Sequence, residues 1–100
     1  MRDLKDKVAV VTGGSSGIGQ AIALALANCG CRVAVVGTAQ ARIDGTLALL
    51  PVDRDSRGYV CDVADRAAVA AMADAVETDF GQIDIIVNNA GITSSAPFAE

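Results

Sequence analysis

Apolar and polar positions alternate along the chain with two different periods. Short β-branched runs bounded by polar residues or glycine are typical of buried strands, whereas apolar residues three or four apart are typical of amphipathic helices. The pattern predicts strands at residues 8–11, 32–36, 58–61 and 83–87. It predicts helices between them at residues 18–29, 39–50 and 69–80; the first and last of these are followed by a glycine, which favours helix termination.

The alternation of strand and helix determines the expected fold. Strands joined by helices through short links run parallel, with right-handed crossovers. The consecutive apolar residues 85–87 are typical of a strand covered on both faces, as in a doubly wound sheet. The prediction is therefore an α/β fold: the amino-terminal portion of a Rossmann-like, doubly wound parallel sheet, with about four strands and three helices over residues 1–100.

Composition and charge narrow the classes of function. Apolar residues make up 52% of the chain, which is enough for a core, and the net charge is −4. No basic stripe or patch indicates a nucleic-acid or membrane partner. The longest apolar stretch, residues 21–27, is far shorter than the ~20 residues of a membrane helix, so a cytoplasmic protein is predicted. Three cysteines and no histidine fit no metal spacing, and we interpret the cysteines as buried apolar side chains.

A glycine-rich stretch joins the first predicted strand to the first predicted helix. Residues 10–25 read VVTGGSSGIGQAIALA. A helix amino terminus offers unpaired N–H groups and a partial positive charge, so glycines at such a bend are typical of a phosphate site. A tight turn without a ligand is the alternative. Gln20 and Ala21 stand where a P-loop needs Lys and Ser or Thr, which disfavours a nucleotide triphosphatase, and the spacing does not fit Gly-x-Gly-x-x-Gly either.

Further segments agree with this one in order and spacing. Ligands of doubly wound sheets bind beyond the carboxyl ends of the strands, where all of these segments are predicted to lie. They are Thr12-Gly13-Gly14-Ser15-Ser16-Gly17-Ile18-Gly19, Asp62-Val63 and Asn88-Asn89-Ala90-Gly91. Together they resemble the short-chain dehydrogenase/reductase family, and the resemblance covers essentially all of the chain.

The resemblance implies contacts with a nicotinamide dinucleotide. The implied cofactor-binding residues of these segments are Gly13, Ser15, Ser16, Gly17, Ile18, Gly19, Asp62, Val63, Asn89, Ala90 and Gly91. The glycine-rich segment would line the pyrophosphate and the adenosine ribose. Asp62 would accept a hydrogen bond from the adenine amino group and Val63 would contact the ring, while residues 89–91 would lie along the nicotinamide-side ribose.

Four positions of these segments have further expectations attached. For Asp62, the alternative is a charge at a helix amino terminus near Asp65. Thr12 and Asn88 are expected to be structural and to tie the ends of the first and fourth strands together. A valine at Gly17 is expected to obstruct the pyrophosphate and to strain the turn.

The end of the second predicted strand bears on the choice between NAD and NADP. An NAD-specific site usually has an acid there that bonds the ribose 2′-OH, but Gly37 and Thr38 are not acidic, and the next acid is Asp44. Residues 35–39, VVGTA, resemble the NADPH-dependent 3-oxoacyl-[acyl-carrier-protein] reductase branch of the family. Thr38, the N–H groups of Ala39 and Gln40, and Arg42 would receive the 2′-phosphate, so NADP is the favoured cofactor. The alternative for Arg42 is a solvated helix residue. NAD is the alternative, because Ser16 stands where NADPH-preferring members often carry a basic residue.

The catalytic residues that the family uses are not found in these 100 residues. The family carries out hydride transfer with a Tyr-x-x-x-Lys pair, but Tyr59 is followed four positions later by Val63, and the lysines are Lys5 and Lys7. No catalytic residue is therefore assigned, and the chain alone is predicted to be inactive. We expect the cofactor-binding half of a longer, homo-oligomeric reductase of a small carbonyl or alcohol substrate, with a 3-oxoacyl thioester as the first candidate. A non-catalytic NADP(H)-binding module or sensor is the alternative.

Overall fold

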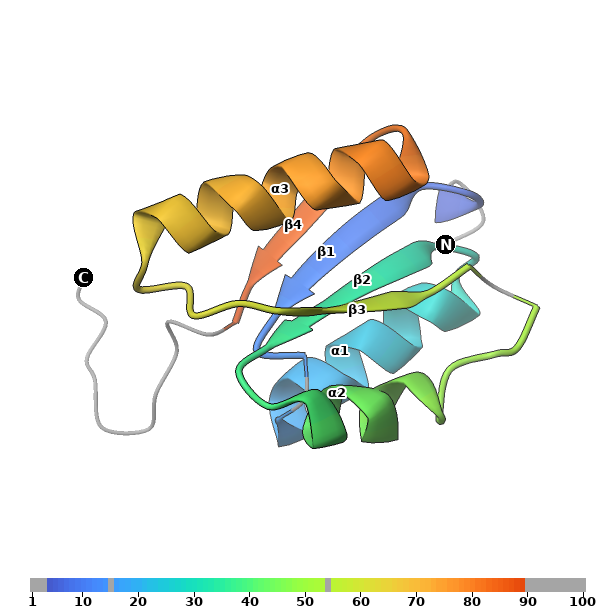
Figure 1. Ribbon diagram of the computed structural model, residues 1–100. Helices are drawn as coiled ribbons and strands as arrows, with labels where there is room; N and C mark the ends of the chain where they lie inside the picture. Colours follow the sequence, from blue (N-terminus) through green and yellow to red (C-terminus); the bar gives the residue numbers. More distant parts are fainter. Residues whose placement is uncertain (1–3, 15, 54, 90–100) are drawn as a thin grey trace.

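The computed structural model describes residues 4–14, 16–53 and 55–89, which form a parallel sheet with helices on both faces (Figure 1). The strands are β1 (Val8–Thr12), β2 (Arg32–Gly37), β3 (Arg57–Val60) and β4 (Ile85–Asn88). The helices are α1 (Gly17–Asn28), α2 (Gln40–Leu47) and α3 (Arg66–Phe80). Helix α3 covers one face of the sheet, and α1 and α2 cover the other (Figure 1). The predicted fold class is confirmed.

The strands lie in the order β3-β2-β1-β4, and every neighbouring pair is parallel. The chain steps outward from β1 through β2 to β3 and then crosses back to place β4 on the other side of β1. The strand order therefore reverses between β1 and β4, and ligands of such sheets bind at this reversal, outside the carboxyl ends of the strands.

Alternate residues of the two central strands fill two separate cores. Ala9, Val11, Val33 and Val35 face α1 and α2, whereas Val8, Val10, Ala34 and Val36 face α3; all of them are buried. This arrangement explains why β1 and β2 are apolar at nearly every position. The expectation of two covered faces is wrong for β4 among the described residues, because Ile86 is 67% exposed and β4 pairs only with β1.

Helix boundaries differ from the predicted ones by more than one residue at two places. Helix α3 begins at Arg66 rather than at residue 69, because the carboxylate of Asp65 accepts hydrogen bonds from the N–H groups of Ala67 and Ala68. Helix α2 ends at Leu47 rather than at residue 50. The last apolar residues of that stretch continue as turns, in which the N–H of Leu50 donates to the carbonyl of Leu47.

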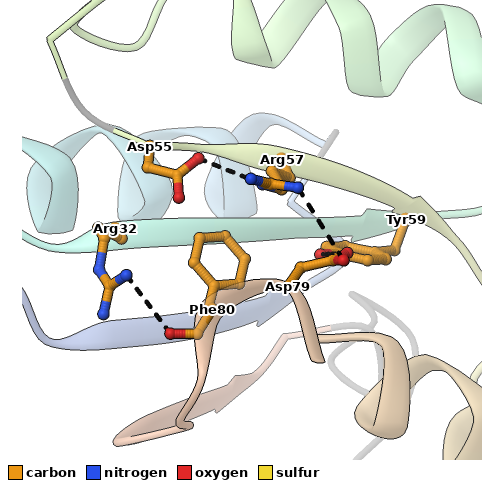
Figure 2. Close-up of polar contacts among 6 residues, drawn as sticks. All are labelled: Arg32, Asp55, Arg57, Tyr59, Asp79 and Phe80. Carbon is orange, nitrogen blue, oxygen red and sulfur yellow. Dashed lines mark hydrogen bonds and ion pairs between the residues drawn. The ribbon is translucent and has the colours of Figure 1, made fainter. Parts of the chain in front are cut away.

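The carboxyl-terminal end of α3 is fastened to the sheet by a polar cluster around Phe80 (Figure 2). The guanidinium carbons of Arg32 and Arg57 each lie 5.7 Å from the centroid of the Phe80 ring. Arg32 also donates to the carbonyl oxygen of Phe80, and the hydroxyl of Tyr59 donates to Asp79 at 2.7 Å. Burial, together with this hydrogen bond, raises the pKa of Tyr59 well above its ordinary value. Tyr59 is thus a packing residue of β3 and α3.

Candidate functional site

A cleft of about 390 Å³ opens at the carboxyl ends of the strands. It is lined by Gly13, Ser16, Val36, Gly37, Thr38, Arg42, Cys61, Asp62, Val63 and Asn89. These residues lie at or just after the carboxyl ends of all four strands, so the fold brings together segments that are far apart in the sequence. Ser15, Ala90 and Gly91, which the sequence also predicts for this site, lie outside the described residues.

The turn after β1 depends on two of its glycines. Gly13 has a φ of 66°, in the left-handed region that residues with a Cβ rarely adopt. A Cβ added to Gly19 would lie 1.9 Å from the carbonyl oxygen of Gly13 and 2.8 Å from the amide nitrogen of Asn89. Gly19 therefore lets the first turn of α1 pack against the loop. It is buried and does not line the cleft, and its contact with a cofactor stays a prediction.

Gly17 and Ile18 lie on the open side of the same turn. No atom lies within 4 Å of a Cβ added to Gly17, and its φ is not in the left-handed region. The expected backbone strain at Gly17 is therefore wrong, while obstruction of a ligand stays a prediction. Ile18 is 65% exposed and does not line the cleft.

The amino terminus of α1 has no side-chain cap. Ser16 occupies the N-cap position, but its hydroxyl donates to the carbonyl oxygen of Gly13 at 2.8 Å instead of accepting from the helix. Helix α3, in contrast, is capped by Asp65. An uncapped first turn leaves N–H groups and the positive end of the helix dipole facing the cleft, which is an arrangement that binds anions.

The end of β4 closes one side of the cleft and supports the turn. The Thr12 hydroxyl donates to the carbonyl oxygen of Val87 and to Oδ1 of Asn88, both at 3.2 Å, which confirms that Thr12 and Asn88 tie β1 to β4. Asn89 is buried, and its Nδ2 lies 3.3 Å from the carbonyl oxygen of Gly13 and 3.4 Å from Oγ of Ser16. Asn89 therefore lines the cleft and also holds the glycine-rich turn.

The wall that follows β3 contains Cys61, Asp62 and Val63. Oδ1 of Asp62 accepts from the N–H of Ala64 at 3.0 Å, which orients the carboxylate in the turn before α3. The N-cap of α3 is Asp65, so Asp62 does not cap this helix, while a charge at the helix amino terminus stays the alternative for Asp62. Burial first, and then the neighbouring Asp62 and Asp65, raise the pKa of the Cys61 thiol, which keeps that side chain neutral at physiological pH.

The wall that follows β2 carries a hydroxyl and a cation. Thr38 and Arg42 line the cleft, and both side chains are exposed. Asp44 is the nearest acid along the chain, but it does not line the cleft, and its Oδ1 accepts from Nε2 of Gln40 at 2.8 Å. Among the described lining residues, Arg42 and Asp62 are the charged ones.

Comparison with known proteins identifies the family. A family model described as short chain dehydrogenase matches residues 7–100. The chain belongs to the short chain dehydrogenase family. The parallel sheet, the glycine-rich turn and the cleft at the strand ends are therefore features of a member of this family.

Individual relatives agree with this assignment. The chain is 51% identical over 98 residues to D-threitol dehydrogenase from Mycolicibacterium smegmatis, covering 97% of this chain and 38% of that enzyme. It is 43% identical over 100 residues to 2-dehydro-3-deoxy-D-gluconate 5-dehydrogenase from Pseudoalteromonas atlantica, covering 97% of this chain and 39% of that enzyme. A crystal structure of NAD⁺-bound xylitol dehydrogenase matches with a TM-score of 0.85 at 38% identity, over 89% of this chain and 35% of that one. The chain thus spans about two fifths of the length of the curated relatives it matches.

Two polar residues behind the turn were not predicted from the pattern. Thr46 of α2 is fully buried, and its hydroxyl donates to the carbonyl oxygen of Gly14 at 3.1 Å. Gln20 of α1 donates to the same hydroxyl at 3.1 Å. The available signal was a threonine three positions after Ile43, on the face of α2 that is otherwise apolar.

The described residues form neither a metal-binding cluster nor a membrane-spanning helix. Within residues 4–14, 16–53 and 55–89, no three Cys, Asp or Glu side chains gather closely enough to hold a metal ion. None of the helices in these ranges is long and apolar enough to cross a membrane.

Proposed function

We propose that the protein is an oxidoreductase that uses a nicotinamide dinucleotide, and that residues 1–100 are its cofactor-binding half. The observation that carries this proposal is the uncapped amino terminus of α1, which faces a cleft walled by Asp62, Val63 and Asn89. When bound, the dinucleotide would give or take a hydride at C4 of the nicotinamide. The chain's own residues would bind and orient it.

The chemistry of the cleft fits such a dinucleotide part by part. The first turn of α1, with Ser16 and the bare backbone of Gly17, would hold the pyrophosphate, because N–H groups and the helix dipole attract an anion. The Asp62 carboxylate would accept from the adenine amino group beside Val63. Asn89 would lie on the nicotinamide side. Ser15, Ala90 and Gly91 are proposed to complete these contacts, as the family resemblance implies.

The cofactor is proposed to be NADP rather than NAD. Thr38 can donate a hydrogen bond to a 2′-phosphate, and the guanidinium of Arg42 can pair with it. A carboxylate at the end of β2 would repel that phosphate, and the positions there are Gly37 and Thr38. Since the xylitol dehydrogenase structure is NAD⁺-bound, both cofactors belong in the test.

The substrate is proposed to be a small alcohol or carbonyl compound. The relatives are named for a polyol and for a sugar acid, which makes such hydroxylated compounds suitable for an initial screen. The 3-oxoacyl thioester stays a prediction that the same screen would test. The Tyr-x-x-x-Lys pair is proposed to lie in a further part of a longer reductase, because residues 1–100 do not contain it.

Cofactor titration and turnover together test the proposal. The protein, expressed at the full length of its coding sequence, is titrated with NADPH and NADH, and binding is followed by nicotinamide fluorescence. Saturable binding with the tighter affinity for NADPH, together with NADPH oxidation by one of the screened carbonyl compounds, is expected. Binding without any turnover would favour the non-catalytic module or sensor. No binding of either dinucleotide would refute the proposal.

The role of Arg42 can be separated from dinucleotide binding in general. Replacing Arg42 with Gln removes the charge but keeps a polar side chain on the exposed surface of α2. The NADPH dissociation constant is expected to rise about tenfold, since a charge-assisted hydrogen bond contributes about 1.5–3 kcal/mol. The dissociation constant for NADH is expected to stay within about twofold, and an equal rise for both cofactors would contradict the assignment of Arg42 to the 2′-phosphate.

A further inference from the structure

Thr46 is a buried polar residue that joins three elements behind the cleft. Its hydroxyl donates to the carbonyl oxygen of Gly14 in the glycine-rich turn and accepts from Nε2 of Gln20 in α1. Thr46 itself belongs to α2 and is 0% exposed. Burying a hydroxyl costs free energy of folding unless the hydroxyl is hydrogen-bonded, and these two hydrogen bonds offset that cost for Thr46. The residue does not line the cleft.

Hydrogen bonds fix the first two carbonyl groups of the glycine-rich turn, those of Gly13 and Gly14. The carbonyl oxygen of Gly13 accepts from the N–H and the hydroxyl of Ser16 and from the side chain of Asn89. The carbonyl oxygen of Gly14 accepts from Thr46, while the N–H of Gly14 donates to the carbonyl of Val36 at 3.1 Å. A carbonyl oxygen released from its donor could rotate, and one that turned toward an anion would repel it.

Helix α2 is a firm support for this contact because it packs directly on the backbone of β3. A Cβ added to Gly58 would lie 2.3 Å from Cγ2 of Ile43 and 3.2 Å from Cδ1 of Leu47. Ile43 is fully buried in the core below α2. The same helix carries Arg42 on the wall of the cleft, four positions before Thr46. The position of α2 thus fixes both a cleft residue and the donor to the turn.

We propose, on the basis of the function proposed above, that Thr46 is a positioning residue for dinucleotide binding. Its hydroxyl holds the carbonyl of Gly14 against α2. The turn that would receive the pyrophosphate therefore keeps a fixed position relative to α2, the helix that carries Arg42. Gln20 supports this arrangement by donating to the same hydroxyl, which leaves the Thr46 proton directed at Gly14.

Replacement of Thr46 with Val tests the proposal, because valine has the same shape and lacks the hydroxyl. The dissociation constant for NADPH is expected to rise about tenfold, because the Gly14 carbonyl loses its donor and is released to turn toward the bound anion. Thr46→Ser is the matched control, because it keeps the hydroxyl, and its affinity is expected to stay within about threefold of wild type. The protein is used at the full length of its coding sequence.

A second ligand distinguishes positioning from general damage to the fold. Adenosine 2′-monophosphate has the 2′-phosphate and the adenine but no pyrophosphate, so its affinity is expected to change less than twofold in Thr46→Val. An equal loss of affinity for both ligands would indicate a general structural effect and overturn the proposal. Affinity for NADPH that is unchanged in a folded Thr46→Val variant would also overturn it.

Gln20→Met provides a test that does not depend on the folding of Thr46→Val. Gln20 is only partly buried, and methionine keeps the length of its side chain while removing the donor to Thr46. A rise of about threefold in the NADPH dissociation constant is expected, and an unchanged constant would contradict the proposed network. Failure of the wild-type protein to bind NADPH would instead refute the proposed function itself.

Discussion

Gly19 and Gly45 allow the packing of the glycine-rich turn to be tested with one substitution at two helical positions. A Cβ at Gly19 would lie 1.9 Å from a backbone oxygen of Gly13, whereas a Cβ at Gly45 in α2 would meet nothing within 4 Å. Neither residue has a φ in the left-handed region. Gly45→Ala is therefore expected to stabilise the protein by about 0.5–1 kcal/mol, because alanine has the higher helix propensity.

Gly19→Ala is expected to have the opposite effect on stability. The same gain in propensity is outweighed by overpacking, which typically costs about 1–3 kcal/mol and here forces the backbone of the turn to move. The net loss is about 0.5–2 kcal/mol, so the two alanine variants are expected to differ by about 1–3 kcal/mol in free energy of unfolding. Urea denaturation of both variants at neutral pH measures this difference directly.

The same pair of variants also links packing to binding. Since the displaced turn is the one proposed to hold the pyrophosphate, Gly19→Ala should weaken NADPH binding and Gly45→Ala should leave it unchanged. If the two variants have equal stability, the close approach of α1 to Gly13 is wrong. If Gly19→Ala is destabilised but binds NADPH as tightly as wild type, the turn is not part of the binding site.

Three further predictions follow from individual side chains. Ser16→Asp should weaken NADPH binding by at least tenfold in isothermal titration without loss of stability, because aspartate is a good N-cap but repels a pyrophosphate. Ala25→Glu, about 14 Å further along α1, should have little effect, and equal affinities in both variants would refute the anion site. Thr38→Asp should shift the ratio of the kcat/KM values for NADP and NAD toward NAD, because the carboxylate would repel a 2′-phosphate and accept a hydrogen bond from a 2′-OH. An unchanged ratio would mean that residue 38 does not face the ribose. Hydrogen bonds from the N–H of Val8 and then from the amide of Gln82 lower the pKa of Asp84. The Asp84 carboxylate therefore stabilises the fold at pH values above the ordinary pKa of 3.8, and this contribution is lost as the pH falls through the lowered pKa. Asp84→Asn should accordingly be less stable than wild type at pH 7 in urea denaturation, with a gap that closes at the acidic end; a gap that is independent of pH would contradict this role.

The pattern of apolar residues predicted the strands correctly where helices cover both faces of the sheet. Residues of β1 and β2 are apolar on both faces because helices cover both, and that pattern was visible in the sequence. The exposed Ile86 of β4 shows the limit of this rule. A run of apolar residues indicates a strand, but it does not tell whether the described residues cover one face of that strand or both. The start of α3 at Arg66 is set by the capping side chain of Asp65, which the spacing of apolar residues does not indicate.

The site was predictable where it depends on residues at strand ends. The segments around Gly13, Asp62 and Asn89 meet in one cleft because parallel strands bring their carboxyl ends to the same edge. The support from Thr46 was not predictable, because it joins residues 32 positions apart through a helix whose orientation only the packed structure defines. The absence of strain at Gly17 likewise depends on φ, which the residue type does not fix.

The proposed dinucleotide cleft is tested most directly by amide hydrogen exchange of the full-length protein with and without NADPH. Bound pyrophosphate would engage the N–H groups of the first turn of α1, so exchange in peptides that cover residues 13–20 and 61–64 should slow. Exchange at the carboxyl-terminal end of α3, around Asp79 and Phe80, should not change, because that end is fastened to the sheet away from the cleft (Figure 2). Slowed exchange at the first two segments is the predicted result; unchanged exchange at residues 13–20 under saturating NADPH would contradict the proposed site.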